Sequence, residues 1–180
     1  MSKFAEGLVL AFDQTLGNTG VSVVKNSADG LEVVYTGIFK RTDPLKGFDM
    51  TIKRGLEFKK ELYDWMLNFS YLPKLTAVVH EMPAVRGYRI ESSLIASFIV
   101  HQVVDDLGLS IPLCSISNQH GKKVVGLKNT ASKADVKFAV EKILNYDEGD
   151  IAKPVIWNQH VSDSVMLGLT YLYDQNEVVL

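Results

Sequence analysis

Five apolar residues, Leu8–Phe12, run directly into an aspartate, Asp13. A short apolar run of this kind is typical of a buried strand. A carboxylate at the exit of a core strand is expensive to bury unless it finds a partner. The pattern therefore predicts a sheet built around residues 8–12, with Asp13 held at one of its ends. The alternative is that Asp13 only opens a turn, a position that aspartate favours.

The order of the remaining elements predicts the rest of the sheet. Strands over Val21–Lys25 and Leu31–Phe39, joined by an Asp29-Gly30 turn, follow the first one and form an antiparallel set. Helices and strands then alternate: helix 51–69, strand 75–80, helix 91–107 and strand 111–116. Two helices end the chain, over residues 133–145 (with Ser132 as its N-cap) and 161–173. We therefore predict one α/β domain, residues 1–180, in which a mixed five-stranded sheet of three antiparallel and then parallel strands is flanked by helices.

Composition and charge narrow the class of protein. Hydrophobic residues make up 47% of the chain and charged residues 22%, and the net charge is −2, which excludes a strongly basic, histone-like protein. The single cysteine, Cys114, can form no internal disulfide. We see no secretory signal and no apolar stretch near the length of a membrane span, so no membrane partner is expected. A cytoplasmic location is expected, in a bacterial cell or a phage-infected host.

Acidic residues at the ends of predicted elements form a candidate metal site. Glu81 ends the fourth strand as Asp13 ends the first, and His160 and Asp163 lie three residues apart at the start of the last helix, on one face. Three carboxylates and one imidazole suit Mg²⁺ or Mn²⁺ better than a structural zinc. The alternative is that Glu81 is a solvated strand end and that His160 and Asp163 only cap the helix.

Four segments in the same order resemble the motifs of RuvC-like Holliday-junction resolvases, including phage-type members, in the RNase H-like nuclease superfamily. LAFDQTLGNTGVSVV (residues 10–24) resembles the first motif, with an aspartate followed six and seven residues later by Thr-Gly. VVHE (78–81) resembles the second, VVGLKNTASKADV (124–136) the segment with DNA-contacting lysines, and HVSD (160–163) the last. The likeness spans about residues 8–173.

The resemblance implies an RNase H-like fold, a homodimer and cleavage of branched DNA, four-way junctions in particular, with 5′-phosphate and 3′-hydroxyl products. It implies two divalent ions, Mg²⁺ or Mn²⁺, per active site, and the catalytic residues implied are Asp13, Glu81, His160, Asp163 and Lys133. Two positions depart from the family. The usual Asp-Pro-Gly is Asp13-Gln14-Thr15, and Ala84 stands where an aromatic residue often wedges into the junction.

Basic residues fit a nucleic-acid partner. Between Ser117 and Lys137, five lysines stand against one acid, Asp135, a local charge of 5 − 1 = +4. The alternative is that this run of lysines is only a solvated surface. If the lysines contact DNA phosphates, the affinity for DNA should be sensitive to salt. The predicted DNA contacts are Arg86, Tyr88, Arg89, Lys122, Lys123, Lys128, Lys133 and Lys137.

Two alternatives stay open at this stage. One is a less selective nuclease that acts on flaps, forks or RNA–DNA hybrids, which the missing aromatic wedge favours. The other is a catalytically silent DNA-binding subunit with the same fold. His80, in the fourth strand, is expected to be a packed residue that supports the site rather than a ligand.

Overall fold

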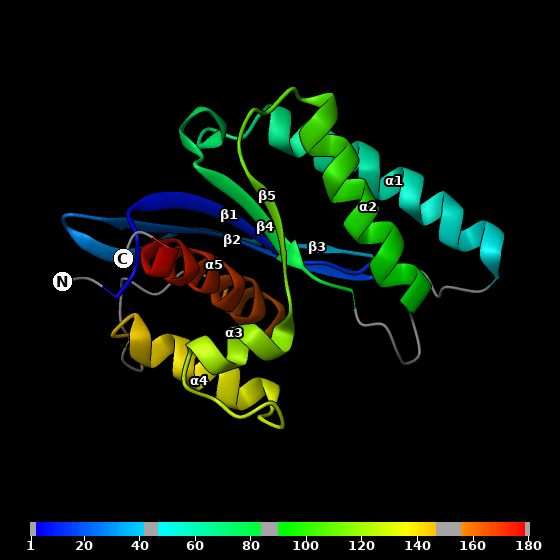
Figure 1. Ribbon diagram of the computed structural model, residues 1–180. Coiled ribbons are helices and arrows are strands. Elements are labelled where there is room, and N and C mark those ends of the chain that lie inside the picture. The colour runs from blue at the N-terminus through cyan, green and yellow to red at the C-terminus, as the bar shows by residue number, and fades with distance from the viewer. Residues whose placement is uncertain (1–2, 42–46, 84–89, 147–155, 179–180) are drawn as a thin grey trace.

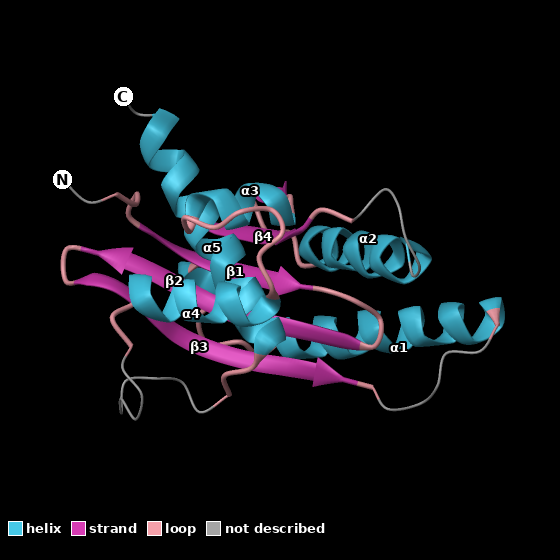
Figure 2. Ribbon diagram, turned by 90° about the horizontal axis from the view of Figure 1, so that it is seen from below, coloured by secondary structure: helices cyan, strands magenta, loops and turns pink. Residues whose placement is uncertain are grey.

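Five strands form one mixed sheet in a computed structural model that describes residues 3–41, 47–83, 90–146 and 156–178. The spatial order is β3-β2-β1-β4-β5, and Figure 2 shows the first four of these side by side. The strands are β1 (Gly7–Asp13), β2 (Asn18–Ser27), β3 (Gly30–Lys40), β4 (Ala77–Glu81) and β5 (Leu113–Ile116).

The pairing of the strands confirms the predicted sheet. β2 pairs antiparallel with both β1 and β3, whereas β4 runs parallel to β1 and β5 parallel to β4. Parallel strands end at the same edge of a sheet, so Asp13 and Glu81, the last residues of β1 and β4, lie at one edge. β2 begins at Asn18, three residues earlier than predicted. The residues before Val21 still pair through their backbone, as Gly20 does with Asp13.

Helices cover both faces of the sheet. In Figure 1, α1 and α2 lie on one side, and α3, α4 and α5 on the other. Their bounds are α1 (Phe48–Leu67), α2 (Ile90–Asp106), α3 (Asn118–Val124), α4 (Lys133–Ile143) and α5 (Gln159–Val178), with a short 3₁₀ helix, η1 (Leu72–Lys74), before β4. The sequence did not predict α3. Within the described residues, no helix has the length and hydropathy to cross a bilayer.

Alternation along β1 divides the core into two clusters. Leu10 and Phe12 pack on the side of α1 and α2, whereas Val9 and Ala11 pack on the side of α5. Successive side chains of a strand point to opposite faces, so the next residue, Asp13, belongs to the α5 face. The site described below follows from this alternation.

Candidate active site

The two strand-end carboxylates lie on the same face of the sheet. In β4, Ala77 and Val79 belong to the α5-side cluster, so Glu81, two residues further, points to that side as Asp13 does. Asp13 is buried, with 6% of its surface exposed, and Glu81 is partly buried. The alternation thus places the two acidic side chains together under the start of α5.

The first turn of α5 completes the acidic group. Nδ1 of His160 lies 2.8 Å from Oδ2 of Asp13, and Asp163 is 4% exposed. Gly20, which pairs with Asp13, permits this approach: a Cβ atom at Gly20 would lie 2.2 Å from the backbone oxygen of His160. The glycine of the Thr-Gly pair in the first motif therefore has a steric role, since the start of α5 lies directly on β2.

Lys133 enters the site from α4. Its Nζ lies 2.9 Å from Oδ2 of Asp163. Ser132 caps α4 by accepting a hydrogen bond from the Asp135 backbone N–H, while the Asp135 side chain accepts one from the Ser132 N–H, which fixes where the helix begins. Four separate elements, β1, β4, α4 and α5, therefore supply Asp13, Glu81, Lys133, His160 and Asp163, and the sequence-predicted catalytic residues gather at one place.

Burial and neighbouring charges shift the pKa values of three groups in this site. Burial, and then the charge of Asp13, raise the pKa of Glu81 to about 8, while the Asn118 side chain acts in the opposite direction. Burial and Asp13 also raise the pKa of Asp163, against the effect of Lys133. Burial alone would lower the pKa of Lys133, but its bond with Asp163 and the other carboxylates raise it above its ordinary value.

The donor set fits a hard divalent cation in its chemistry. No three His, Cys, Asp or Glu side chains within the described ranges are already arranged as a metal-holding group. Here His160 contacts Asp13, and Lys133 contacts Asp163. Three carboxylates with one imidazole are nevertheless ligands that suit Mg²⁺ or Mn²⁺. Burial is the main cause of the raised pKa of Glu81, and the charges of Asp13 and Asp163 add to it. A divalent cation would neutralise these charges.

The raised pKa of Glu81 makes stability depend on pH. Because the folded protein keeps the Glu81 proton between its ordinary pKa of 4.5 and about 8, the free energy of unfolding falls as pH rises through that range. His80, whose pKa burial lowers from 6.5 to about 4, has the opposite slope up to pH 6.5. Between pH 6.5 and 8, only Glu81 of these two groups changes the free energy of unfolding. Its deprotonation lowers that free energy by about 2 kcal/mol over this range.

We therefore expect Glu81→Gln to abolish this loss. Urea unfolding of the wild-type protein without divalent ions should show stability decreasing from pH 6.5 to 8, while the variant stays level over the same range. Glu91→Gln, which changes an exposed residue in the first turn of α2, is the control and should keep the wild-type slope. Equal slopes in wild type and Glu81→Gln would contradict the raised pKa.

A basic hollow lies beside helix α3, whose first residue, Asn118, contacts the Glu81 carboxyl. Ser117, directly after β5, lines it together with the exposed residues Lys123 and Lys128. Lys122 has a different place, since its Nζ donates to the backbone oxygens of Asn129 (3.2 Å) and Ala131 (2.8 Å) and so braces the loop before α4. Of the predicted DNA contacts, Lys123 and Lys128 are thus exposed in the same hollow, whereas Lys122 is hydrogen-bonded within the protein.

Other predicted contacts are placed differently. Lys137 lies on α4 and is partly buried. Arg86, Tyr88 and Arg89, and Ala84 at the wedge position, fall outside the described residues. They stay predictions.

Residues that the sequence analysis did not identify also surround Glu81. The Gln14 side chain, fully buried, makes two hydrogen bonds to the Glu81 backbone. Asn118, at the start of α3, lies beside the Glu81 carboxyl. His80 is fully buried, as expected, and its Nε2 lies 2.8 Å from Nε2 of His101 on α2. The position of Gln14 next to Asp13 was the available signal for its role, since a polar residue there falls on the opposite face.

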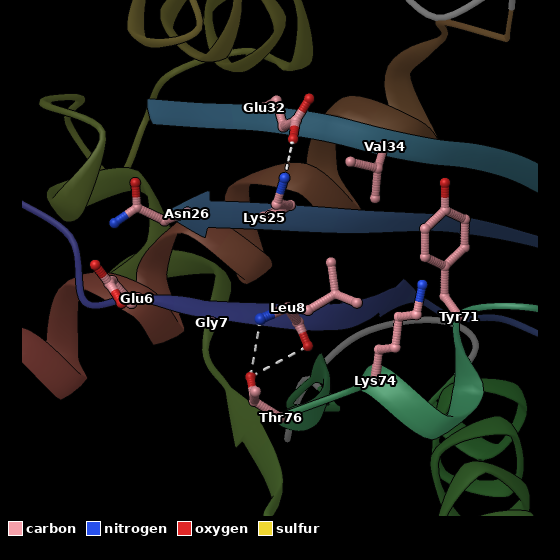
Figure 3. Close-up of a pocket in the computed structure, with 10 residues that line it drawn as sticks. All are labelled: Glu6, Gly7, Leu8, Lys25, Asn26, Glu32, Val34, Tyr71, Lys74 and Thr76. Atoms are coloured by element: carbon pink, nitrogen blue, oxygen red, sulfur yellow. Dashed lines mark hydrogen bonds and ion pairs between the residues drawn. The ribbon is translucent and has the colours of Figure 1, made fainter. Parts of the chain in front are cut away.

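A second hollow lies at the opposite end of β1, away from the acidic residues (Figure 3). Two pairs of its polar groups contact each other: Nζ of Lys25 lies 2.6 Å from Oε1 of Glu32, and Oγ1 of Thr76 lies 2.9 Å from the backbone nitrogen of Leu8. Lys74 also lines it. It therefore serves below as a control surface.

Solved structures resemble this chain, although no family model and no curated protein sequence matches it. Thermus thermophilus RuvC in complex with a Holliday junction substrate is 16% identical, with a TM-score of 0.69 over 94% of this chain and 96% of that one. The yeast mitochondrial Holliday junction resolvase Ydc2 is 12% identical (TM-score 0.64; 98% and 82%). The fowlpox virus resolvase in complex with Holliday junction DNA is 12% identical (TM-score 0.55; 93% and 98%). At these identities the likeness establishes the fold, which is RuvC-like and confirms the predicted RNase H-like class.

Proposed function

We propose that this protein is a metal-dependent endonuclease that resolves four-way DNA junctions. The observation that carries the proposal is the convergence of Asp13, Glu81 and Asp163 from three elements, with the pKa of Glu81 raised to about 8. Excess negative charge at the edge of a rigid sheet supports a cation-binding role. The RuvC-like fold, shared with the three resolvases above, favours branched DNA as the substrate.

In this proposal each acidic residue has a defined role. Asp13, Glu81 and Asp163 hold divalent cations, Mg²⁺ or Mn²⁺ and two per site, and His160 joins the ligand set from its place beside Asp13. Cations held by these residues would supply an activated water for attack on the phosphodiester and charge stabilisation for the leaving 3′ oxygen, with 5′-phosphate and 3′-hydroxyl ends as products. Lys133 balances the charge of Asp163, and its side chain is half exposed, so it could also contact a phosphate of the DNA.

A homodimer is part of the same proposal. Two sites related by a two-fold axis match the symmetry of a four-way junction and account for paired nicks. Large apolar side chains on the paired helices α1 and α2 support it, because they are exposed in the single chain: Ile52 (42%), Leu56 (66%), Leu94 (52%) and Phe98 (61%). A purely monomeric protein in sedimentation at assay concentrations would contradict this part.

Cleavage of labelled synthetic DNA tests the proposal. With Mg²⁺ or Mn²⁺, we expect symmetric paired nicks in a four-way junction and much slower cutting of Y-forks, flaps and RNA–DNA hybrids. Equal cutting of all substrates would favour the less selective nuclease. Tight junction binding without cutting in either metal would favour the silent DNA-binding subunit.

The two exposed lysines of the basic hollow should carry part of the DNA affinity. Replacing both Lys123 and Lys128 with alanine is expected to weaken junction binding and to reduce the slope of log affinity against log salt by roughly 1.8, about 0.9 for each lost phosphate contact. The matched control replaces Lys25 and Lys74, which line the hollow in Figure 3, and removes the same charge at the other end of β1. Equal losses in both double variants would show that only net charge matters.

A further inference from the structure

The Gln14 side chain holds the backbone of the residue that carries the second strand-end carboxylate. Its Nε2 donates to the backbone oxygen of Glu81 at 2.7 Å, and its Oε1 accepts from the Glu81 backbone N–H at 3.0 Å. Gln14 is fully buried and follows Asp13 directly. One side chain therefore fixes both main-chain polar groups of Glu81 from a position covalently next to Asp13.

These two hydrogen bonds extend the sheet beyond its last backbone pair. The parallel pairing of β1 with β4 ends at Phe12 and His80, one residue before each carboxylate. Buried backbone groups require partners, and past this point the Gln14 amide supplies them. The separation of the Asp13 and Glu81 backbones is thus set by a side chain.

The chemistry of the contact requires an amide of this length. The Glu81 N–H needs an acceptor and its carbonyl needs a donor, which fixes how the amide of Gln14 is oriented. A carboxylate would turn an acceptor toward the carbonyl. An apolar side chain would leave the Glu81 N–H without this acceptor and leave the carbonyl with Nδ1 of His80, which lies 3.0 Å from it. On the α2 side, Nδ1 of His80 lies 3.3 Å from Nε2 of Gln14 and 3.1 Å from Oγ of Ser97. The Gln14 amide therefore also contacts a polar side chain on that side of the sheet.

We propose that Gln14 is a positioning residue for the cation site, which keeps the Glu81 carboxyl beside Asp13 at the spacing that a shared divalent cation needs. The inference rests on the proposed function. It concerns a position at which this chain departs from the usual Asp-Pro-Gly of the family it resembles. Gln14 does not touch the cation in this proposal and acts through the Glu81 backbone.

The chain offers a matched control for a purely structural role. Asn26 is also a buried amide, 5% exposed, and its Nδ2 donates to the backbone oxygens of Phe4 (2.8 Å) and Ala5 (3.0 Å). It lies in β2 opposite Gly7, at the far end of β1 from Asp13. Gln14→Met and Asn26→Leu each remove two buried hydrogen bonds to the main chain, and only the first touches Glu81.

Direct Mn²⁺ binding to the full chain is the deciding measurement, made by titration calorimetry at a temperature where each variant is folded by circular dichroism. We expect Gln14→Met to bind Mn²⁺ roughly 10- to 100-fold more weakly than wild type, the cost typical of losing a residue that orients a ligand. Asn26→Leu should bind Mn²⁺ as wild type does, even if its melting temperature falls. Junction affinity without metal should be unchanged in both.

Each other outcome has a definite meaning. Wild-type Mn²⁺ affinity in Gln14→Met, or an equal loss in Asn26→Leu, would overturn the positioning role and leave the proposed function intact. Failure of wild type itself to bind Mn²⁺ would overturn the proposed metal dependence and the inference with it. If Gln14→Met does not fold, Gln14→Asn, which keeps the amide but shortens its reach, is measured in its place with the same expectations.

Discussion

Replacing Asp13 with asparagine should reduce junction cleavage roughly 10³-fold, the size of effect found when one electrostatic element of an active site is removed. The substitution is nearly isosteric, and its side-chain oxygen can still meet His160, which lies 2.8 Å from the aspartate. The fold should therefore persist. What is lost is the charge that, with burial, raises the pKa values of both Glu81 and Asp163.

DNA binding by the Asp13→Asn protein should be equal to that of wild type or tighter, because a negative charge facing the phosphates has been removed. Single-turnover cleavage of a labelled junction measures the first effect, and binding to the same junction without metal measures the second. Asp174→Asn removes one charge at the surface, where Asp174 pairs with His120 at 2.9 Å, and should cut at the wild-type rate. Undiminished cleavage by Asp13→Asn would remove Asp13 from the active site.

The sheet and the acidic cluster could be predicted from the sequence because both follow from period-two alternation. Val9, Ala11 and Asp13 share a face, as do Ala77, Val79 and Glu81, and parallel pairing brings the two strand ends together. Spacing along one helix likewise placed His160 and Asp163 on one face. These rules are local, and together with the order of the elements they were enough to predict which residues meet at the site.

The rest could not be predicted because it depends on contacts between residues distant in sequence. The bonds of Gln14 to Glu81 join positions 67 residues apart. In the sequence, Lys122 cannot be told apart from the other lysines of the basic run. Only the fold shows that its Nζ donates to the backbone oxygens of Asn129 and Ala131. Helix α3 covers only 7 residues, and it begins at the Ser117 side chain, which accepts from the His120 N–H. A helix of that length carries too little periodic signal to be recognised.

Gly20→Ala should be the most damaging substitution that introduces no polar or charged group. A Cβ atom there would lie 2.2 Å from the backbone oxygen of His160 and 2.8 Å from the backbone nitrogen of Val161. Backbone atoms cannot rotate away, so the start of α5 must move off the sheet. We expect a loss of about 3 kcal/mol in the free energy of unfolding, the upper end for overpacking.

The effect on cleavage should exceed the effect on stability. At a temperature where Gly20→Ala is folded, cleavage should fall roughly 10²-fold, because a displacement of about 1 Å at a catalytic group has that cost. The matched control is Gly121→Ala, whose Cβ would meet the flexible end of Met166 at 2.9 Å. There the methionine can turn aside, and alanine favours the helix, so both stability and cleavage should stay near wild type.

Chemical denaturation and single-turnover cleavage of the two variants, measured side by side, separate sterics from catalysis. Loss of stability with full cleavage in Gly20→Ala would mean that the start of α5 is not part of the active site, which would remove His160 and Asp163 together. Loss of both, with Gly121→Ala unaffected, would show that the site depends on how closely α5 lies against β2. Gly20 would then serve catalysis through steric access, because the absence of a Cβ there lets α5 bring His160 and Asp163 to Asp13.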